Sequence, residues 1–121
     1  MVLVDTSIWV SFFQTGNPRL KELLDEGHIL SHPFIIGELA CGNLTNRLEI
    51  LALLKALPPA IEARHEEALH LIEFHSLMSQ GLGYVDIHLL TAALLMSVSL
   101  WTSDKSLKDA AARLRIDFKS D

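Results

Sequence analysis

The first residues of the chain constrain its fold most, because a short apolar strand runs directly into an acid. Val2–Val4 are branched apolar residues, which favour a strand that is covered on both faces. Asp5 follows at once, and apolar side chains at helical spacing begin just after it. In open parallel sheets, ligands bind outside the carboxyl ends of the strands. The sequence therefore predicts that Asp5 lies at the ligand-binding edge of a parallel sheet.

Strand-like and helix-like segments alternate along the rest of the chain. We expect further strands at residues 28–31, 60–63, 98–102 and 116–119, with 60–63 at a sheet edge. We expect helices at residues 7–14, 19–26, 33–41, 47–57, 65–80, 85–96 and 105–114. This alternation predicts an α/β fold, a single three-layer domain over residues 1–121. Its central, mostly parallel sheet would have about four to five short strands flanked by helices.

Composition narrows the class of protein. The chain has 121 residues, half of them apolar, which is enough for one hydrophobic core. No apolar run reaches the roughly 18 residues of a membrane span, and we expect no signal peptide at the N-terminus. The single cysteine, Cys41, excludes an internal disulfide and favours a reducing cytoplasm, where we expect a small buried thiol.

Four acids flank the apolar segments, and three of them have a purely structural explanation. Asp5 and Asp104 follow predicted strands, and Asp86 stands at the start of the most apolar helix. Aspartate is a favoured N-cap residue, so each could simply begin a helix. Glu38 is different, because it lies within a predicted helix among apolar neighbours, on a face that we expect to be largely buried. A buried carboxylate without a partner costs on the order of several kcal/mol.

Glu38 therefore needs a basic partner or a metal ion, unless its face is less buried than the pattern indicates. Arg47, Lys105 and Lys108 are the candidate partners. The joint pattern favours a metal, because acids after parallel strands converge at one sheet edge, and clustered anions repel unless a proton or cation is present. Hard divalent cations prefer carboxylate oxygens, and they activate water and stabilise charge on phosphoryl oxygens. The four acids thus predict hydrolysis of a phosphodiester.

The same residues resemble the acidic signature of PIN domains. The matching motifs are Asp5-Thr6-Ser7, Glu38-Leu39, Asp86 within residues 84–93, and Thr102-Ser103-Asp104-Lys105, in the order that the family has. Within that family, the chain looks most like the VapC-type toxins of toxin–antitoxin pairs. The resemblance implies an endoribonuclease that depends on Mg²⁺ or Mn²⁺, cuts structured RNA of the tRNA or rRNA class, and leaves 5′-phosphate and 3′-hydroxyl ends. It also implies a homodimer that is neutralised by a cognate VapB-type antitoxin, whose tail lies over the active site.

The resemblance also implies a role for each matching residue. Asp5 and Asp86 correspond to the direct metal ligands. Asp104, which we count with the metal ligands, and Glu38 complete the catalytic pocket, directly or through water. Ser7 and Thr102 match polar positions that support the acids through hydrogen bonds.

Two departures from the family pattern bear on the site. Ser106 and Leu107 stand where many relatives have a further acid and a phenylalanine, so a second metal site is expected to be weaker or absent. His88 stands where relatives usually have a small or apolar residue. We expect this histidine to pack or to face solvent, with a contact to substrate as the alternative.

The charge of the chain does not decide which surface would bind RNA. The net charge of −5 argues against simple electrostatic attraction to nucleic acid. Half of the ten basic residues lie near the C-terminus, at Lys105, Lys108, Arg113, Arg115 and Lys119. They either form a surface for RNA or, because acids are interspersed among them, an ordinary solvated face.

Two other functions remain open. One is a catalytically silent PIN-like interaction module, for which the serine at 106 and the negative charge leave room. The other is a receiver-type signalling domain, which has a similar length and an acidic Mg²⁺ pocket, although this chain lacks the expected acid pair after the first strand. A histidine zinc site is not expected, because His65, His70 and His75 do not fall on one helical face.

Overall fold

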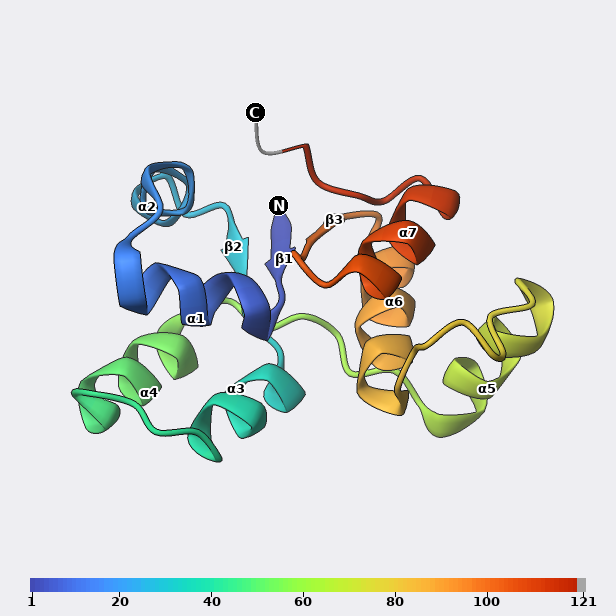
Figure 1. Ribbon diagram of the computed structural model, residues 1–121, viewed down its shortest axis with the longest axis horizontal. Helices are drawn as coiled ribbons and strands as arrows, with labels where there is room; N and C mark the ends of the chain where they lie inside the picture. The colour runs from blue at the N-terminus through green and yellow to red at the C-terminus, as the bar shows by residue number, and fades with distance from the viewer. Residues whose placement is uncertain (120–121) are drawn as a thin grey trace.

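A parallel sheet of three short strands lies at the centre of the computed structural model, which describes residues 1–119 (Figure 1). The strands are β1 (Val2–Val4), β2 (Ile29–Leu30) and β3 (Ser99–Trp101), in the order β2-β1-β3. β1 pairs parallel to both neighbours, with Leu3 opposite Leu30 on one side and Leu100 on the other. All three carboxyl ends therefore lie at the same edge of the sheet.

Seven helices surround the sheet within the described residues. They are α1 (Thr6–Thr15), α2 (Pro18–Asp25), α3 (Pro33–Ala40), α4 (Arg47–Ala56), α5 (His65–Phe74), α6 (Tyr84–Met96) and α7 (Lys105–Arg113). Figure 1 shows α1 to α4 on one side of the sheet and α5 to α7 on the other. This arrangement confirms the predicted α/β fold with a parallel sheet between helices.

The sheet is narrower than the four to five strands predicted from the sequence. The expected strands at 60–63 and 116–119 are reduced to isolated parallel bridges, between Ser31 and Pro59 and between Leu100 and Asp117. Prolines at 58 and 59 explain the first case, because proline has no N–H to donate to a ladder. In the second case, Leu100 exchanges backbone hydrogen bonds with residues 116 and 118, and the pairing extends no further.

Helix α5 ends at Phe74, although the apolar pattern predicted a helix as far as residue 80. Ser76 adopts a left-handed backbone conformation, with φ of 52°. Leu77 then turns back, donates its N–H to the carbonyl of Ile72 at 2.9 Å, and buries its side chain. This closure is a Schellman-type end in which serine takes the place usually held by glycine, so no sequence signal marked it.

Helix α6 is the most enclosed helix of the fold. Its residues 87–93 are all buried, because the helix packs against β3 on one side and α5 on the other. Ala92 and Ala93 are fully buried, which permits the close packing expected of an alanine pair. None of the helices within residues 1–119 is both long and apolar enough to cross a membrane.

The expectation that Cys41 is a buried thiol is wrong. Cys41 is exposed, at the C-terminal cap of α3. The buried positions of this helix are Ile35 and Leu39, one turn apart, and Cys41 does not fall on their face.

Candidate active site

Asp5 is a buried acid at the carboxyl end of β1, and neighbouring hydroxyls hold its carboxylate. Its Oδ2 accepts hydrogen bonds from Ser7 Oγ at 2.9 Å and from Thr102 Oγ1 at 2.7 Å. Asp5 occupies the N-cap position of α1, but its side chain makes no capping hydrogen bond. Helix capping therefore does not explain its carboxylate.

Thr102 links the ends of β1 and β3. Besides donating to Asp5, its Oγ1 accepts the N–H of Asp104 at 3.0 Å, and the next residue, Ser103, donates its N–H to Ser7 Oγ at 3.1 Å. The parallel register places Val4 opposite Trp101, so Asp5 and Thr102 leave the sheet side by side. The predicted supporting positions, Ser7 and Thr102, thus contact the acid that they were expected to support.

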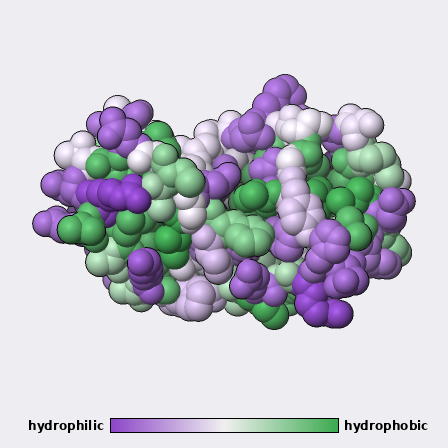
Figure 2. All heavy atoms as spheres, turned by 90° about the horizontal axis from the view of Figure 1, so that it is seen from below, coloured by the Kyte–Doolittle hydropathy of each residue, from purple (hydrophilic) through white to green (hydrophobic). Residues whose placement is uncertain are grey.

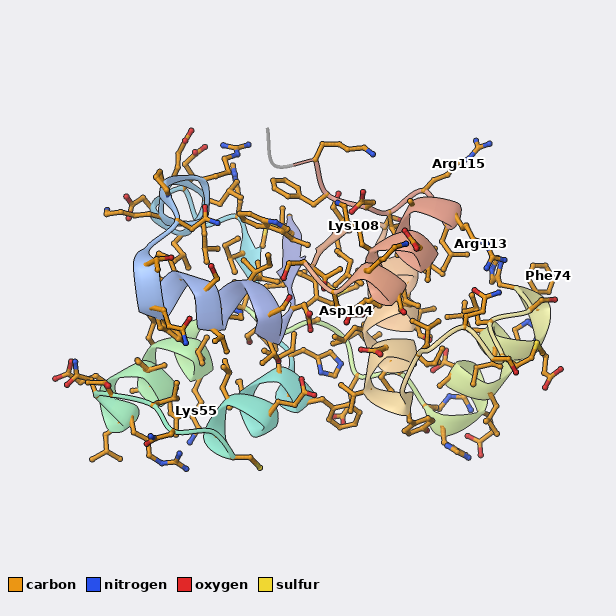
Figure 3. All side chains as sticks on the ribbon, in the orientation of Figure 1. Lys55, Phe74, Asp104, Lys108, Arg113 and Arg115 are labelled. Carbon is orange, nitrogen blue, oxygen red and sulfur yellow. The ribbon has the colours of Figure 1, made fainter. Side chains whose placement is uncertain are left out.

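Asp104 caps helix α7. Its Oδ2 accepts the N–H of Leu107 at 3.0 Å, so the simple structural explanation holds for this acid. Figure 3 shows Asp104 at the start of α7, between the ribbons of α1 and α6. Capping uses one carboxylate oxygen, and the backbone bond to Thr102 ties the same residue to the site of Asp5.

Glu38 is exposed, so the expectation of a largely buried face is wrong. The inward positions of α3 are Ile35 and Leu39, and Glu38 lies one residue away from the buried stripe. Its Oε1 accepts a 2.6 Å hydrogen bond from Thr6 Oγ1, at the first residue of α1. Within residues 1–119, no salt bridge joins Glu38 to a basic side chain.

Asp86 is the acid whose carboxyl is influenced by the charges of the other three acids. It lies in the first turn of α6, half-buried, and its Oδ2 accepts the N–H of Gly83 at 2.9 Å. Burial raises the pKa of the Asp86 carboxyl, and the negative charges of Asp5, Asp104 and Glu38 raise it further, against the lowering effect of the Gly83 N–H. The other three predicted acids thus all lie within electrostatic reach of Asp86.

The chemistry of these side chains fits a divalent cation. The donors are all carboxylates, and within residues 1–119 none of the four is neutralised by a salt bridge. In the described part of the chain, no group of three or more histidine, cysteine, aspartate or glutamate side chains is gathered closely enough to hold a metal ion, so the four acids form an open set. Mg²⁺ suits such an open set, because it binds through a few carboxylates and keeps several of its waters.

The loop at Gly81 lies close to Ser106, in the first turn of α7. A Cβ atom at Gly81 would lie 2.9 Å from Ser106 Oγ, and Gly81 has a φ of +75°. Ser106 is half-buried in the first turn of α7. The close approach of Ser106 and the positive φ therefore favour glycine at position 81.

His88 packs against aromatic rings, as one of the two expectations for this residue stated. It is buried, with ring centroids 5.0 Å from Phe34 and 4.5 Å from Tyr84, both in edge-on geometry. Tyr84 in turn contacts the ring of His65, and Phe34 contacts the ring of His32. This aromatic row, residues 32, 34, 88, 84 and 65, joins α3, α6 and α5. The sequence did not predict this row. Only Tyr84 and His88 lie on one helix, four residues apart, and the contacts of Phe34 with His88 and of His65 with Tyr84 depend on how the three helices pack together.

A groove adjoins the acids on the side of α1, α3 and α4. It has a volume of about 670 Å³, and Thr6 and Glu38 are among its lining residues. Most of its other lining residues are apolar or uncharged, including Val10, Phe13 and Leu44. Figure 2 shows the face at the carboxyl ends of the strands, where hydrophobic side chains gather on the α3–α4 side and on the α6–α5 side.

Three of the five C-terminal basic residues have acidic partners on a solvated face. Lys105 pairs with Asp109 at 2.9 Å, and Lys108 and Lys119 both pair with Asp117. Arg113 donates to Gln80 and to the carbonyl of His75. Figure 3 shows Arg113 and Arg115 at the end of α7 far from Asp104. Of the two alternatives for these residues, their contacts favour the solvated face.

The family model of the PIN domain matches residues 2–113, and the chain belongs to the PIN-domain family. Within that family it is of the VapC type, as the motifs predicted. It is 42% identical over 113 residues to Ribonuclease VapC32 of Mycobacterium tuberculosis, in both strain CDC 1551 / Oshkosh and strain ATCC 25618 / H37Rv. The alignment covers 93% of this chain and 91% of each relative. The fold is also similar to a chain in the structure of FitAB bound to the IR36 DNA fragment, with a TM-score of 0.62, 18% identity, and coverage of 93% of this chain and 91% of that chain.

Proposed function

We propose that this chain is the toxin of a VapBC-type toxin–antitoxin pair and hydrolyses RNA phosphodiester bonds with a divalent metal ion, in the cytoplasm. Its membership of the VapC type makes it a ribonuclease, which is a hydrolase. The metal-dependent mechanism rests on one observation. The half-buried Asp86 carries a pKa that is raised by burial and by three further carboxylates, and such a cluster favours a cation.

The residues would divide the work as follows. Asp5, fixed by two hydroxyls, and Asp86, fixed by the Gly83 N–H, would bind Mg²⁺ or Mn²⁺ directly, with Asp104 as a third ligand. An ion held by these acids would acidify a bound water and stabilise negative charge on the phosphoryl oxygens. Glu38 would orient the attacking water, because Thr6 fixes Oε1 and, within residues 1–119, Oε2 accepts no hydrogen bond. The substrate would be structured RNA of the tRNA or rRNA class, cut to 5′-phosphate and 3′-hydroxyl ends.

A cleavage assay with the purified chain tests this proposal. We expect total tRNA and rRNA to be cut in Mg²⁺ or Mn²⁺ and to stay intact in EDTA. Asp5→Asn and Asp86→Asn should each abolish cleavage and keep the far-UV circular dichroism of the parent. Asp109→Asn is the matched control, an exposed acid on α7 paired with Lys105, and should cleave normally. Full activity in Asp5→Asn would refute the assignment of the site.

The proposed VapB-type antitoxin would use two features at this site. A basic side chain of the antitoxin would pair with the carboxylates, which have no salt-bridge partner within residues 1–119. An apolar segment of the antitoxin would bind in the adjoining groove. Val10, which lines the groove and is 38% exposed, tests the contact. Val10→Glu should weaken the complex with the short protein encoded by the adjacent gene. Leu53→Glu, at an exposed position of α4 outside that groove lining, should not. Equal binding by both variants would place the antitoxin elsewhere.

We also propose a homodimer formed through α5 and α6. Leu69, Leu95 and Met96 are exposed apolar residues on these helices, and a groove of about 440 Å³ runs between them. Light scattering should give twice the chain mass for the parent and the single mass for Leu95→Glu. Leu48→Glu, at an exposed position of α4, is the control and should remain dimeric.

A catalytically silent interaction module is the second candidate function. It is favoured by the acidic partners of Lys105, Lys108 and Lys119, which leave few cations free to attract RNA. Expression in a bacterial host separates the two functions. A toxin should arrest growth, and co-expression of the adjacent small gene should relieve the arrest. A silent module should do neither.

A further inference from the structure

Tyr84 is an exposed aromatic residue that its neighbours hold in place. It is the first residue of α6, two positions before Asp86, and 45% of its surface is accessible. Its hydroxyl is hydrogen-bonded to His65 Nδ1, and the two ring centroids lie 5.5 Å apart. The buried ring of His88 packs against it edge-on at 81°. Two contacts therefore fix the ring while nearly half of the residue faces solvent.

Tyr84 lies in the same helical turn as one of the four acids, Asp86. It follows directly on Gly83, whose N–H binds the Asp86 carboxylate, so the same helical turn carries the ring and the acid. His88 connects Tyr84 to Phe34, which precedes Glu38 by one turn on the same face of α3. The aromatic row thus joins the two helices that carry Glu38 and Asp86, and Tyr84 is its exposed member on α6.

An acidic nuclease needs a source of substrate affinity other than positive charge. The net charge is −5, and the cations nearest Asp104 in sequence are paired with acids. Stacking of an unpaired base on an aromatic ring supplies affinity that does not depend on protein charge. Proteins that act on single-stranded RNA loops commonly bind splayed bases in this way.

We propose that Tyr84 is the platform on which an unpaired base of the RNA substrate stacks, next to the phosphate that the acids receive. His65 is a positioning residue that fixes the plane of the ring through the Tyr84 hydroxyl. The inference rests on the proposed ribonuclease function and adds to it a residue that contacts a base of the substrate.

A second exposed aromatic residue provides the control. Phe74 is 72% exposed and contacts His70 and His75, so it too has histidine neighbours. It lies at the end of α5, far from Asp104 (Figure 3). A role in stacking that depends on the acidic site should therefore belong to Tyr84 and not to Phe74.

Binding and photo-crosslinking test the proposal on the full chain carrying Asp5→Asn, which binds RNA without cutting it. The probe is a single-stranded oligoribonucleotide with 5-iodouridine at successive positions. We expect crosslinks on the peptide that contains Tyr84. We expect binding about tenfold or more weaker in Tyr84→Leu, and within about twofold of the parent in Tyr84→Phe and Phe74→Leu. Unchanged binding in Tyr84→Leu, or crosslinks confined to other peptides, would overturn the proposal.

Three further results complete the test. If Tyr84→Leu does not fold, the crosslink on the intact ring decides the question. His65→Ala should change binding in the parent by no more than Tyr84→Phe does, about twofold, and add nothing in the Tyr84→Phe background, because both changes remove the same hydrogen bond. Cleavage by the unmodified chain distinguishes failure of the stacking role from failure of the proposed ribonuclease function. Cleavage without crosslinks at Tyr84 rejects only the stacking role, whereas absence of metal-dependent cleavage rejects the proposed function.

Discussion

The hydroxyl of Thr102 donates a 2.7 Å hydrogen bond to the carboxylate of Asp5, across 97 residues of sequence. Both side chains are buried, and the parallel pairing of β1 with β3 brings them together. A donated hydrogen bond stabilises the ionised carboxylate and fixes its orientation. The register of β1 and β3 therefore determines where Asp5, the first proposed metal ligand, is held.

Thr102→Val should lower both stability and metal affinity. The change keeps the shape of the side chain but removes the bond to Asp5 and the acceptor for the Asp104 N–H. Leaving these groups unpaired should cost about 1–3 kcal/mol in the free energy of unfolding, measured in urea. Mn²⁺ titration should show weaker binding. Thr15→Val, which removes an exposed hydroxyl bond within α1, should change neither quantity appreciably.

Divalent metal should stabilise the folded chain. An ion that binds the native acids and not the unfolded chain adds about 2.7 kcal/mol at a hundredfold excess over its dissociation constant. The thermal midpoint should therefore rise on adding Mn²⁺ and return on adding EDTA. In Asp86→Asn the rise should be much smaller, and an undiminished rise would place the metal elsewhere.

The metal-free protein should gain stability when Asp86 is neutralised. Burial and the neighbouring acids raise the pKa of this carboxyl in the folded state, so the folded state binds its proton more tightly than the unfolded state does. The free energy of unfolding should then fall as pH rises from the unfolded pKa through the folded one. Asp86→Asn should be more stable than the parent at pH 7 in EDTA, and its advantage should shrink towards pH 4. Asp109→Asn provides the comparison, and an Asp86→Asn variant no more stable than the parent would contradict the prediction.

His32 should make the fold sensitive to mild acid. Its ring is fully buried, and burial lowers its pKa, with His88 adding to the effect and Glu62 opposing it. Nδ1 accepts the N–H of Phe34 at 3.0 Å, which places the proton of the neutral ring on Nε2. Since the folded state favours the neutral ring, stability is complete above the unfolded pKa, about 6.5, and is lost as pH falls towards the lower folded value.

His32→Asn isolates this effect, because the asparagine oxygen can still cap the Phe34 N–H but does not titrate. Urea unfolding between pH 7.5 and 5 should show a shallower loss of stability in His32→Asn than in the parent. Parallel curves for the two proteins would show that another group carries the acid sensitivity.

The predictable part of this molecule is what chain order and apolar pattern determine. The strand before Asp5, the enclosed helix after Asp86 and the parallel arrangement all follow from local sequence. The exposure of Glu38 did not follow, because one position on a helix separates it from the buried Leu39. The end of α5 was hidden because a serine, not a glycine, adopts the left-handed conformation at 76. The stack around His88 depends on how α3, α5 and α6 meet, which no single segment encodes.

The hydrogen bond between Thr102 and Asp5 determines when, during synthesis of the chain, the acidic site can form. During synthesis, Asp5 leaves the ribosome long before residue 102 is made, and until then its carboxylate lacks the partner that orients it. The last strand and the start of α7 complete the acidic site together, since Thr102 and Asp104 arrive within three residues of each other. A chain that stops before residue 102 therefore lacks the hydrogen bond that orients Asp5, and the acidic site is assembled only once residues 102–104 have been made.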